Sequence, residues 1–120
     1  LPPVIILKNN QALISLRTLD FSFIEDEPMH KLYAIFNELK IKPNLIQTGA
    51  IGLQISVDDI AEKIDGFGQK ASLYFDVQIE KGLSLLTLRH YNDETLQRHL
   101  IGKEKVLMQQ NEITIQALYK

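Results

Sequence analysis

The chain has no cysteine among its 120 residues, and this absence excludes several ways of stabilising a small protein. Neither a disulfide framework nor a thiolate metal site can form, so a buried apolar core has to hold the fold. The hydrophobic fraction of 45% and the charged fraction of 23% are close to those of ordinary globular domains, which favours a folded chain over disorder. A chain without cysteine suits a reducing compartment, and we expect a cytoplasmic protein.

The chain also lacks a surplus of positive charge. Its formal net charge is −2, and its lysines and arginines are scattered rather than clustered. Nucleic-acid-binding domains usually carry a basic face that neutralises phosphates, so we expect no nucleic-acid partner. RNA binding on a sheet would also need exposed aromatic side chains on central strands, whereas the few aromatics here fall mainly on apolar faces.

Long apolar runs are missing as well. No segment approaches the roughly 20 apolar residues that span a bilayer, so no membrane partner is expected. The beginning, Leu1-Pro2-Pro3, has neither the basic nor the apolar part of a signal peptide. The first residue is not methionine, which predicts that the chain is part of a longer protein.

The motifs of common catalytic and cofactor sites are absent from the sequence. It contains no P-loop, nucleophile elbow or zinc-protease motif. The three histidines have no metal-ligand spacing, and Gly66-Phe67-Gly68 lacks the third glycine of a dinucleotide-binding loop. We therefore assign no catalytic residue, metal ligand or cofactor to this chain.

Hydrophobic periodicity predicts strands and one long helix in the first half of the chain. Pro28 suits the first turn of a helix. Apolar side chains then recur on one face of that helix at Met29, Leu32, Tyr33, Phe36 and Leu39. Strands are predicted at residues 4–7, 12–16, 44–48 and 51–57, with turns at Asn9-Asn10 and Gly49-Ala50.

The second half predicts two shorter helices among further strands. Asp59 and Glu62 have the spacing of an acidic capping box, which predicts a helix that Gly66 ends. Asp93 predicts the start of another helix, which Gly102 stops. Strands are predicted at residues 73–79, 83–89, 105–110 and 113–119.

An internal repeat organises these elements. Residues 13–18 read Leu-Ile-Ser-Leu-Arg-Thr and residues 85–90 read Leu-Leu-Thr-Leu-Arg-His, so each strand has a hydroxyl residue third and an arginine fifth. Two ordinary amphipathic strands could match by chance. Because a helix and then a hairpin follow each copy, the order of elements favours a duplication.

The repeat predicts an α+β fold built from two units. Residues 11–80 give strand-helix-strand-strand-helix-strand, the βαββαβ pattern of the ferredoxin-like fold. Residues 81–120 stop short of that pattern by one helix and one strand. We expect residues 1–10 to supply the strand, so that two antiparallel sheets with helices on one face are interleaved, and we expect the missing helix to precede Leu1 in a longer parent chain.

Four segments resemble a known family. Residues 10–16, 41–48, 55–58 and 82–91, with their order and spacing, resemble the tandem ACT region at the C-terminus of bacterial monofunctional aspartate kinases. The resemblance covers nearly the whole chain. In that family the first ACT unit is inserted after the first strand of the second, which is the interleaving that the repeat predicts.

The resemblance implies a regulatory role. The parent enzyme would use ATP and Mg²⁺ in an N-terminal catalytic domain to phosphorylate the side-chain carboxyl of L-aspartate, the first step toward lysine, threonine and methionine. The ACT pair would sense an end-product amino acid such as lysine or threonine and would pair subunits as a homodimer. The chain itself would be non-catalytic, and a structural dimerisation module without a ligand is the alternative.

The resemblance also implies a location for the effector. Contacts at the start of the first helix fall on Pro28 and Met29, and those on the second strand fall on Asn44, Gln47 and Thr48. Each set has an ordinary structural alternative, since Pro28 can simply begin a helix and polar side chains can cap turns or face water.

Three positions depart from the family pattern. The helix begins with Glu27-Pro28-Met29 where many relatives have glycine and two apolar residues. Asn44 and Gly49-Ala50 stand where lysine-sensitive relatives often carry an acid, so no acid is expected to face the effector's ammonium at these positions. The acidic run at residues 25–27 is either a solvated loop or an attraction for a cationic effector.

Overall fold

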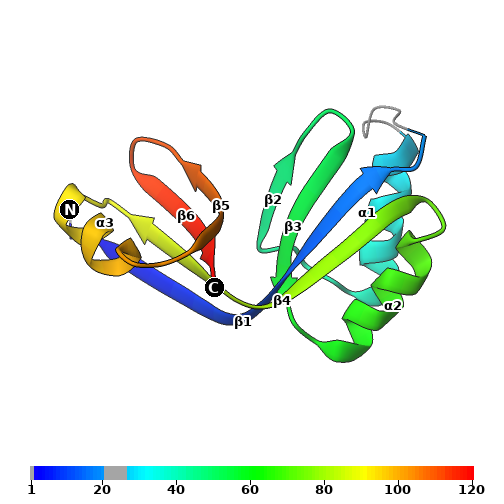
Figure 1. Ribbon diagram of the computed structural model, residues 1–120, viewed down its shortest axis with the longest axis horizontal. Helices are drawn as coiled ribbons and strands as arrows, with labels where there is room; N and C mark the ends of the chain where they lie inside the picture. Colours follow the sequence, from blue (N-terminus) through cyan, green and yellow to red (C-terminus); the bar gives the residue numbers. More distant parts are fainter. Residues whose placement is uncertain (1, 21–26) are drawn as a thin grey trace. The chain divides into compact units, whose positions relative to one another are not determined.

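The computed structural model describes residues 2–20 and 27–120, and this part of the chain contains six strands and three helices (Figure 1). Along the chain they are β1 (Val4–Thr18), α1 (Glu27–Leu39), β2 (Leu45–Thr48), β3 (Gly52–Asp58), α2 (Ala61–Ala71), β4 (Phe75–Arg89), α3 (Asp93–Leu100), β5 (Lys105–Gln110) and β6 (Thr114–Tyr119). Hydrogen bonding gives the strand order β2-β3-β1-β4-β6-β5. The predicted α+β class is confirmed.

The chain divides into two compact units. One consists of Ala12–Lys81, and the other of Leu1–Gln11 together with Gly82–Lys120. Strands β1 and β4 each contribute to both units, so the two predicted interleaved sheets are continuous as one six-stranded sheet.

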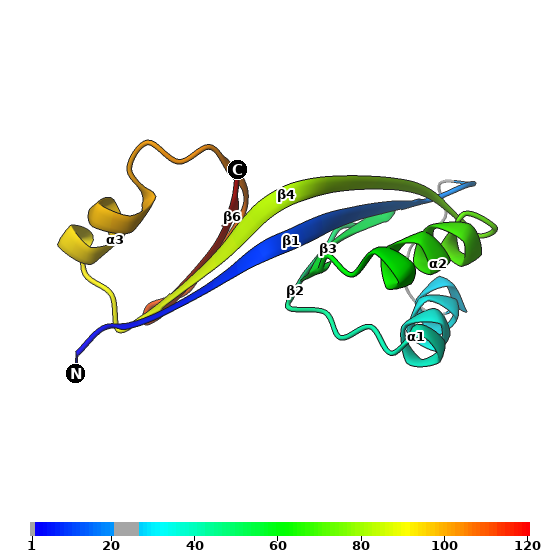
Figure 2. The ribbon, with the colours of Figure 1, turned by 90° about the horizontal axis from the view of Figure 1, so that it is seen from below.

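The unit of residues 12–81 contains β1-α1-β2-β3-α2-β4 with the strand order β2-β3-β1-β4. This is the βαββαβ connectivity of the ferredoxin-like fold. Helices α1 and α2 cover one face of these strands, as Figure 2 shows from below. Phe36 of α1 stacks on Phe67 of α2 with ring centroids 5.4 Å apart, and both side chains are buried. The aromatic pair therefore joins the two helices over the apolar face of the sheet.

Two glycines in this unit permit close packing. A Cβ added at Gly52 in β3 would lie 2.9 Å from the backbone oxygen of Leu16 in β1. A Cβ at Gly66 in α2 would lie 3.3 Å from a methyl group of Leu39 in α1. Both positions keep the backbone of one element close to its neighbour.

The second unit repeats the same neighbour relations with fewer elements. The first half of β1 lies beside the second half of β4, which pairs with β6, and β6 pairs with β5. The Ser84 hydroxyl donates a hydrogen bond to Asn9 Oδ1 at 2.9 Å, which ties β4 to β1. One core cluster of this unit consists of Leu86, Leu88, Leu100, Ile115 and Ala117. Val4–Leu7 thus lies next to the strand that contains Leu83–Arg89.

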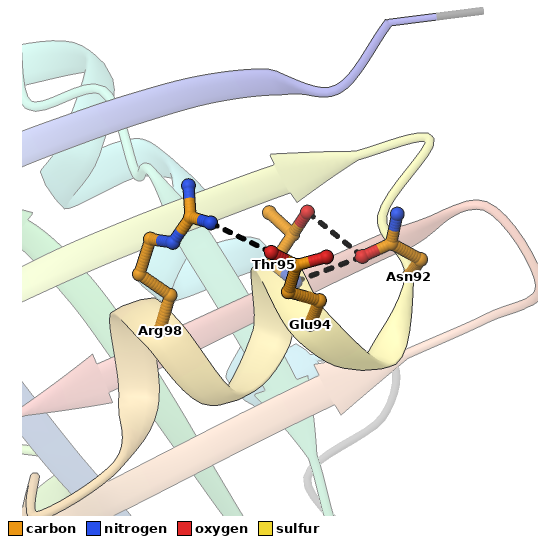
Figure 3. A network of polar contacts seen from close by, with 4 residues as sticks. All are labelled: Asn92, Glu94, Thr95 and Arg98. Atoms are coloured by element: carbon orange, nitrogen blue, oxygen red, sulfur yellow. Dashed lines mark hydrogen bonds and ion pairs between the residues drawn. The ribbon is translucent and has the colours of Figure 1, made fainter.

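Helix α3 begins at an asparagine cap (Figure 3). Asn92 Oδ1 accepts hydrogen bonds from the Thr95 backbone N–H at 2.8 Å and from the Thr95 hydroxyl at 3.0 Å. Arg98 pairs with Glu94 one turn earlier, at 2.9 Å. The sequence placed the cap at Asp93, one residue late, because asparagine and aspartate cap helices about equally well.

The predicted turn at Asn9-Asn10 is wrong, and so is the predicted break between residues 79 and 83. Each position lies inside a continuous fifteen-residue strand. Asn10 has φ 54° and Gly82 has φ 75°, a backbone region that asparagine and glycine tolerate better than other residues. One left-handed residue disturbs a strand locally without reversing the chain. An asparagine or glycine is therefore compatible with a turn and also with an irregular position inside a strand.

The predicted boundaries of α2 are also wrong. Ile60 precedes the helix without a side-chain cap, and Asp59 instead lies 3.5 Å from the Lys81 ammonium. The helix continues through Gly66 and Gly68 to Ala71. Packing outweighs the low helix propensity of glycine here, because Gly66 faces Leu39 and Phe67 is fully buried.

The two environments of Gly52 and Gly68 give a matched test of packing. Gly52→Ala places a methyl group against a strand backbone that cannot move aside, and we expect it to lower the free energy of unfolding by about 1–3 kcal/mol. Gly68→Ala meets nothing closer than 3.9 Å and should raise that free energy by up to about 1 kcal/mol. Urea denaturation of both variants measures the difference, and equal effects would contradict the close β1–β3 approach.

Candidate functional site

An open cavity of about 410 Å³ lies at the start of α1. Its lining comes from the end of β1, the first turns of α1 and the segment before β4: Thr18, Leu19, Asp20, Glu27, Pro28, Lys31, Leu73 and Tyr74. Within it, the Lys31 ammonium lies 4.4 Å from the centre of the Tyr74 ring and 3.6 Å from a Glu27 carboxylate oxygen. Of the predicted effector residues, Pro28 is the one that lines this cavity.

The chemistry of this cavity suits a small ligand that carries both charges. The first turn of a helix presents unpaired backbone N–H groups and the positive end of the helix dipole, which favour a carboxylate. Lys31 adds a cation, whereas Asp20 and Glu27 supply carboxylates that favour an ammonium group. Leu73 and Tyr74 provide an apolar wall beside these polar groups.

The side chain of Met29 has a different environment from that of Pro28. Its side chain packs against the core cluster that includes Leu32 and Phe36. It occupies the apolar stripe of α1, as the helical spacing predicts. Met29 therefore contributes its side chain mainly to packing and can offer its backbone N–H to a ligand.

Gln47 and Thr48 are exposed on β2, the edge strand. They pair with Gln54 and Leu53 of β3 and help to line a second, shallower cavity of about 270 Å³. The Thr18 backbone N–H donates to the Ile51 carbonyl at 2.9 Å, which ties the β2–β3 turn to the end of β1. The end of β2 thus lies at the same end of the unit as the start of α1 (Figure 1). Gln47 and Thr48 nevertheless line a different cavity from Pro28.

Asn44 lies before β2, at the other end of that strand. Its side-chain amide donates a hydrogen bond to Asp58 Oδ1 at 2.9 Å, and its backbone N–H donates to the Ser56 carbonyl at 2.8 Å. Asp58 is a carboxylate that the sequence does not single out, because the family resemblance points to acids only at the positions of Asn44 and Gly49-Ala50. Pairing of the β2–β3 hairpin would have revealed it, since that pairing aligns the start of β2 with the end of β3.

The five predicted residues thus fall in separate places within one chain. Pro28 lines the cavity at α1, Gln47 and Thr48 line the second cavity, and Asn44 lines neither. Glu27 is exposed and pairs with Lys31, while the acidic residues Glu25 and Asp26 lie outside the described part of the chain.

Two further classes of site find no support in residues 2–20 and 27–120. No group of three or more histidine, aspartate or glutamate side chains gathers in these ranges as metal ligands would. Within the same ranges, no helix has the length and apolar character that crossing a membrane requires.

Comparison with known proteins identifies the fold. No family model matches the sequence, and no curated protein matches it. Among solved structures, one assigned as a C-terminal regulatory domain of aspartate kinase from Porphyromonas gingivalis W83 is 16% identical, with a TM-score of 0.81 over 99% of this chain and 86% of that one. The ligand-free regulatory subunit of aspartate kinase from Thermus thermophilus is 12% identical, with a TM-score of 0.67 over 96% and 85%.

A whole enzyme also matches. Aspartokinase III from E. coli, in complex with aspartate and ADP, is 16% identical, with a TM-score of 0.73 over 97% of this chain and 29% of that one. At such identities the likeness concerns the fold. The fold of this chain is that of the regulatory domains of aspartate kinases, which confirms the predicted ferredoxin-like ACT architecture.

The contact between Asn44 and Asp58 predicts the effect of adding charge. Asn44→Asp replaces a hydrogen bond with two neighbouring carboxylates on an exposed surface, and we expect a loss of about 1 kcal/mol in the free energy of unfolding at neutral pH. Gln47→Glu is the control, because it makes the same chemical change on β2 opposite the neutral Gln54. Urea denaturation should separate the two variants, and equal stability would contradict the contact.

Proposed function

We propose that this chain is the regulatory region of an aspartate kinase, and that its two units are interleaved ACT units that sense an amino acid and pair subunits. The observation that carries the proposal is the repeated strand order. If the strands of each unit are numbered in chain order from that unit's first strand, both units have the order 4-1-3-2 across the sheet. The numbering starts at β1 in the unit of residues 12–81 and at β4 in the other unit, where β1 is the fourth strand. The likeness to aspartate kinase regulatory domains over 99% of the chain supports it.

The rest of the enzyme is part of this proposal. An N-terminal domain would bind ATP and Mg²⁺ and transfer phosphate to the side-chain carboxyl of L-aspartate in the cytoplasm. This chain would contribute regulation and no catalytic group. The E. coli enzyme supports that division of labour, because this chain covers only 29% of its length.

The effector, an end-product amino acid such as lysine or threonine, would bind at the start of α1. Its carboxylate would meet the backbone N–H groups of Pro28's neighbours in the first turn, where the helix dipole favours an anion. Its ammonium would meet oxygen atoms of Asn44, Gln47 or Thr48. A structure of aspartokinase III with lysine and aspartate bound supports this class of ligand.

Pairing of two chains would complete such a site. Within one chain, the start of α1 and the polar residues of β2 line different cavities. Strand β2 is at the edge of the sheet, and edge strands readily pair with other chains. A homodimer with two-fold symmetry, the commonest closed assembly, would bring β2 of one subunit to α1 of its partner.

A structural dimerisation module without a ligand is the second candidate. Two contacts favour it: the Asn44 side chain bonds Asp58, and the Met29 side chain packs against the core. The exposed edge of β2 would then pair two subunits without contributing to a ligand site.

Titration distinguishes the two candidates. We expect the chain to sediment as a dimer at micromolar concentration and to bind lysine, threonine or methionine with saturable heat in calorimetry. A dimer that releases no heat with any of the three amino acids supports the structural module. A monomer that binds none contradicts both candidates.

A mixing experiment tests whether two subunits share the site. Pro28→Glu puts a carboxylate where the ligand's carboxylate would lie, and Thr48→Lys puts an ammonium near its ammonium, so each variant alone should lose binding. After exchange of subunits in an equal mixture, half of the dimers are mixed, and each mixed dimer regains one intact site, about one site in four overall. No recovery, with dimers still present by sedimentation, would place the whole site within one chain.

A further inference from the structure

We propose a second binding site in the unit of residues 12–81, formed around the Arg17–Asp76 ion pair, for small zwitterions such as free α-amino acids. It is separate from the effector site proposed at the start of α1 and does not depend on it. The ion pair lies on the face of the sheet opposite the helices, and two hollows border it.

Alternation along the strands places both charges on that face. Leu16 belongs to the core beneath α1 and α2, so the side chain of the next residue, Arg17, points to the other face of β1. Phe75 and Val77 also pack into or against that core, so Asp76 between them points the same way as Arg17. The neighbouring strands β1 and β4 thus present opposite charges side by side.

The geometry of the pair leaves both charges accessible. Arg17 Nη2 lies 3.0 Å from Asp76 Oδ2, and the two side chains are 54% and 45% exposed. One hollow of about 200 Å³ is lined by both residues with Ser15, Leu16 and Gln78. The other, of about 380 Å³, is lined by both residues with Thr18, Leu19, Ser72, Phe75 and Val77. Drug-sized ligands occupy pockets of about 300–1,000 Å³. One hollow is below this range and the other is at its lower end, so both suit small molecules.

The charges match those of an α-amino acid. Such a ligand holds a carboxylate and an ammonium on one carbon, and the protein presents a guanidinium and a carboxylate in contact. A guanidinium has five N–H donors in a fork, so it can bond Asp76 and a second carboxylate together. The ligand's ammonium would then meet Asp76, and every charge would have an opposite partner. A ligand with a single charge would leave one of these contacts unmade.

The surroundings define the ligand further. Ser15 and Gln78 offer neutral hydrogen-bonding groups in the smaller hollow. Leu19 and Val77 give the larger hollow apolar surface, which favours a small or apolar ligand side chain. Exposed ion pairs contribute little to stability, so rearrangement of this pair around a ligand costs little.

Another ion pair provides a matched control. Lys70 Nζ of α2 lies 2.9 Å from Glu38 Oε1 of α1, and the exposure of the two side chains is similar to that of Arg17 and Asp76. That pair lies on the helices, away from the strand face that carries the proposed site. The Lys70–Glu38 pair therefore has the same charges and nearly the same N···O distance as the Arg17–Asp76 pair, but it does not lie on the sheet.

The test is an NMR titration of the 120-residue chain with L-alanine as the probe, beside N-acetyl-L-alanine and L-alaninamide. We expect saturable shifts of the backbone amides at residues 15–17 and 76–78 with millimolar alanine, and at least tenfold weaker binding of the two singly charged derivatives. Arg17→Gln and Asp76→Asn should each weaken alanine binding at least tenfold, whereas Glu38→Gln should leave it unchanged.

Three outcomes would overturn the proposal: no saturable shift at these residues, equal binding of a singly charged derivative, or equal binding by the Asp76→Asn variant. Thermal unfolding of each variant by circular dichroism checks that the fold is retained, which we expect because both side chains are exposed. Shifts at residues 27–31 report the effector site instead. Their absence in a parallel titration with lysine and threonine, with the shifts at 15–17 retained, would count against the proposed effector site alone.

Discussion

The pairing of β1 with β4 is the interaction on which the rest of the structure depends. Each strand has fifteen residues and contributes one half to each unit. In the unit of residues 12–81 they supply the first and fourth strands, and in the other unit they exchange these roles. Each strand also has one left-handed residue close to the boundary between the units, Asn10 in β1 and Gly82 in β4. The strands can therefore deviate from regular geometry at these residues and remain strands.

Much of this fold could be predicted from the sequence, because the hydrophobic pattern records which face each element buries. The apolar stripe of α1 is confirmed at Met29, Leu32, Phe36 and Leu39, and the strand predicted at residues 51–57 is found as β3. Tyr33 was wrongly placed on that stripe, because its side chain is 48% exposed, and Ile35 is buried in its stead. The errors arose where one residue type has two structural uses. Asn10 and Gly82 read as chain reversals, and Gly66 reads as a helix end, but each lies inside a continuous element. Only contacts with distant neighbours, such as Leu39 beside Gly66, decide between the two uses.

The candidate site was harder to predict than the fold, because it depends on which strands are neighbours. Periodicity places Asn44, Gln47 and Thr48 on one strand but does not tell what faces them. The structure puts Asp58 beside Asn44 and leaves Gln47 opposite Gln54. In the same way, Arg17 and Asp76 are fifty-nine positions apart along the chain, and only the adjacency of β1 and β4 reveals them as a pair. Sequence patterns identify polar residues on strands, whereas sheet order decides which of them meet.

The interleaving has a consequence for the order in which the chain folds. Asn9 and Ser84 bond each other across seventy-five positions, so joining them in an otherwise unfolded chain closes a long loop at a considerable entropic cost. All strands and helices of the unit of residues 12–81 lie between those two positions. Once that unit has formed, β1 and β4 leave it as neighbouring strands, and the long loop is already closed. We therefore expect the unit of residues 12–81 to fold first and the unit of residues 1–11 and 82–120 to fold after it. A destabilised core in the unit of residues 12–81 should slow the folding of both units.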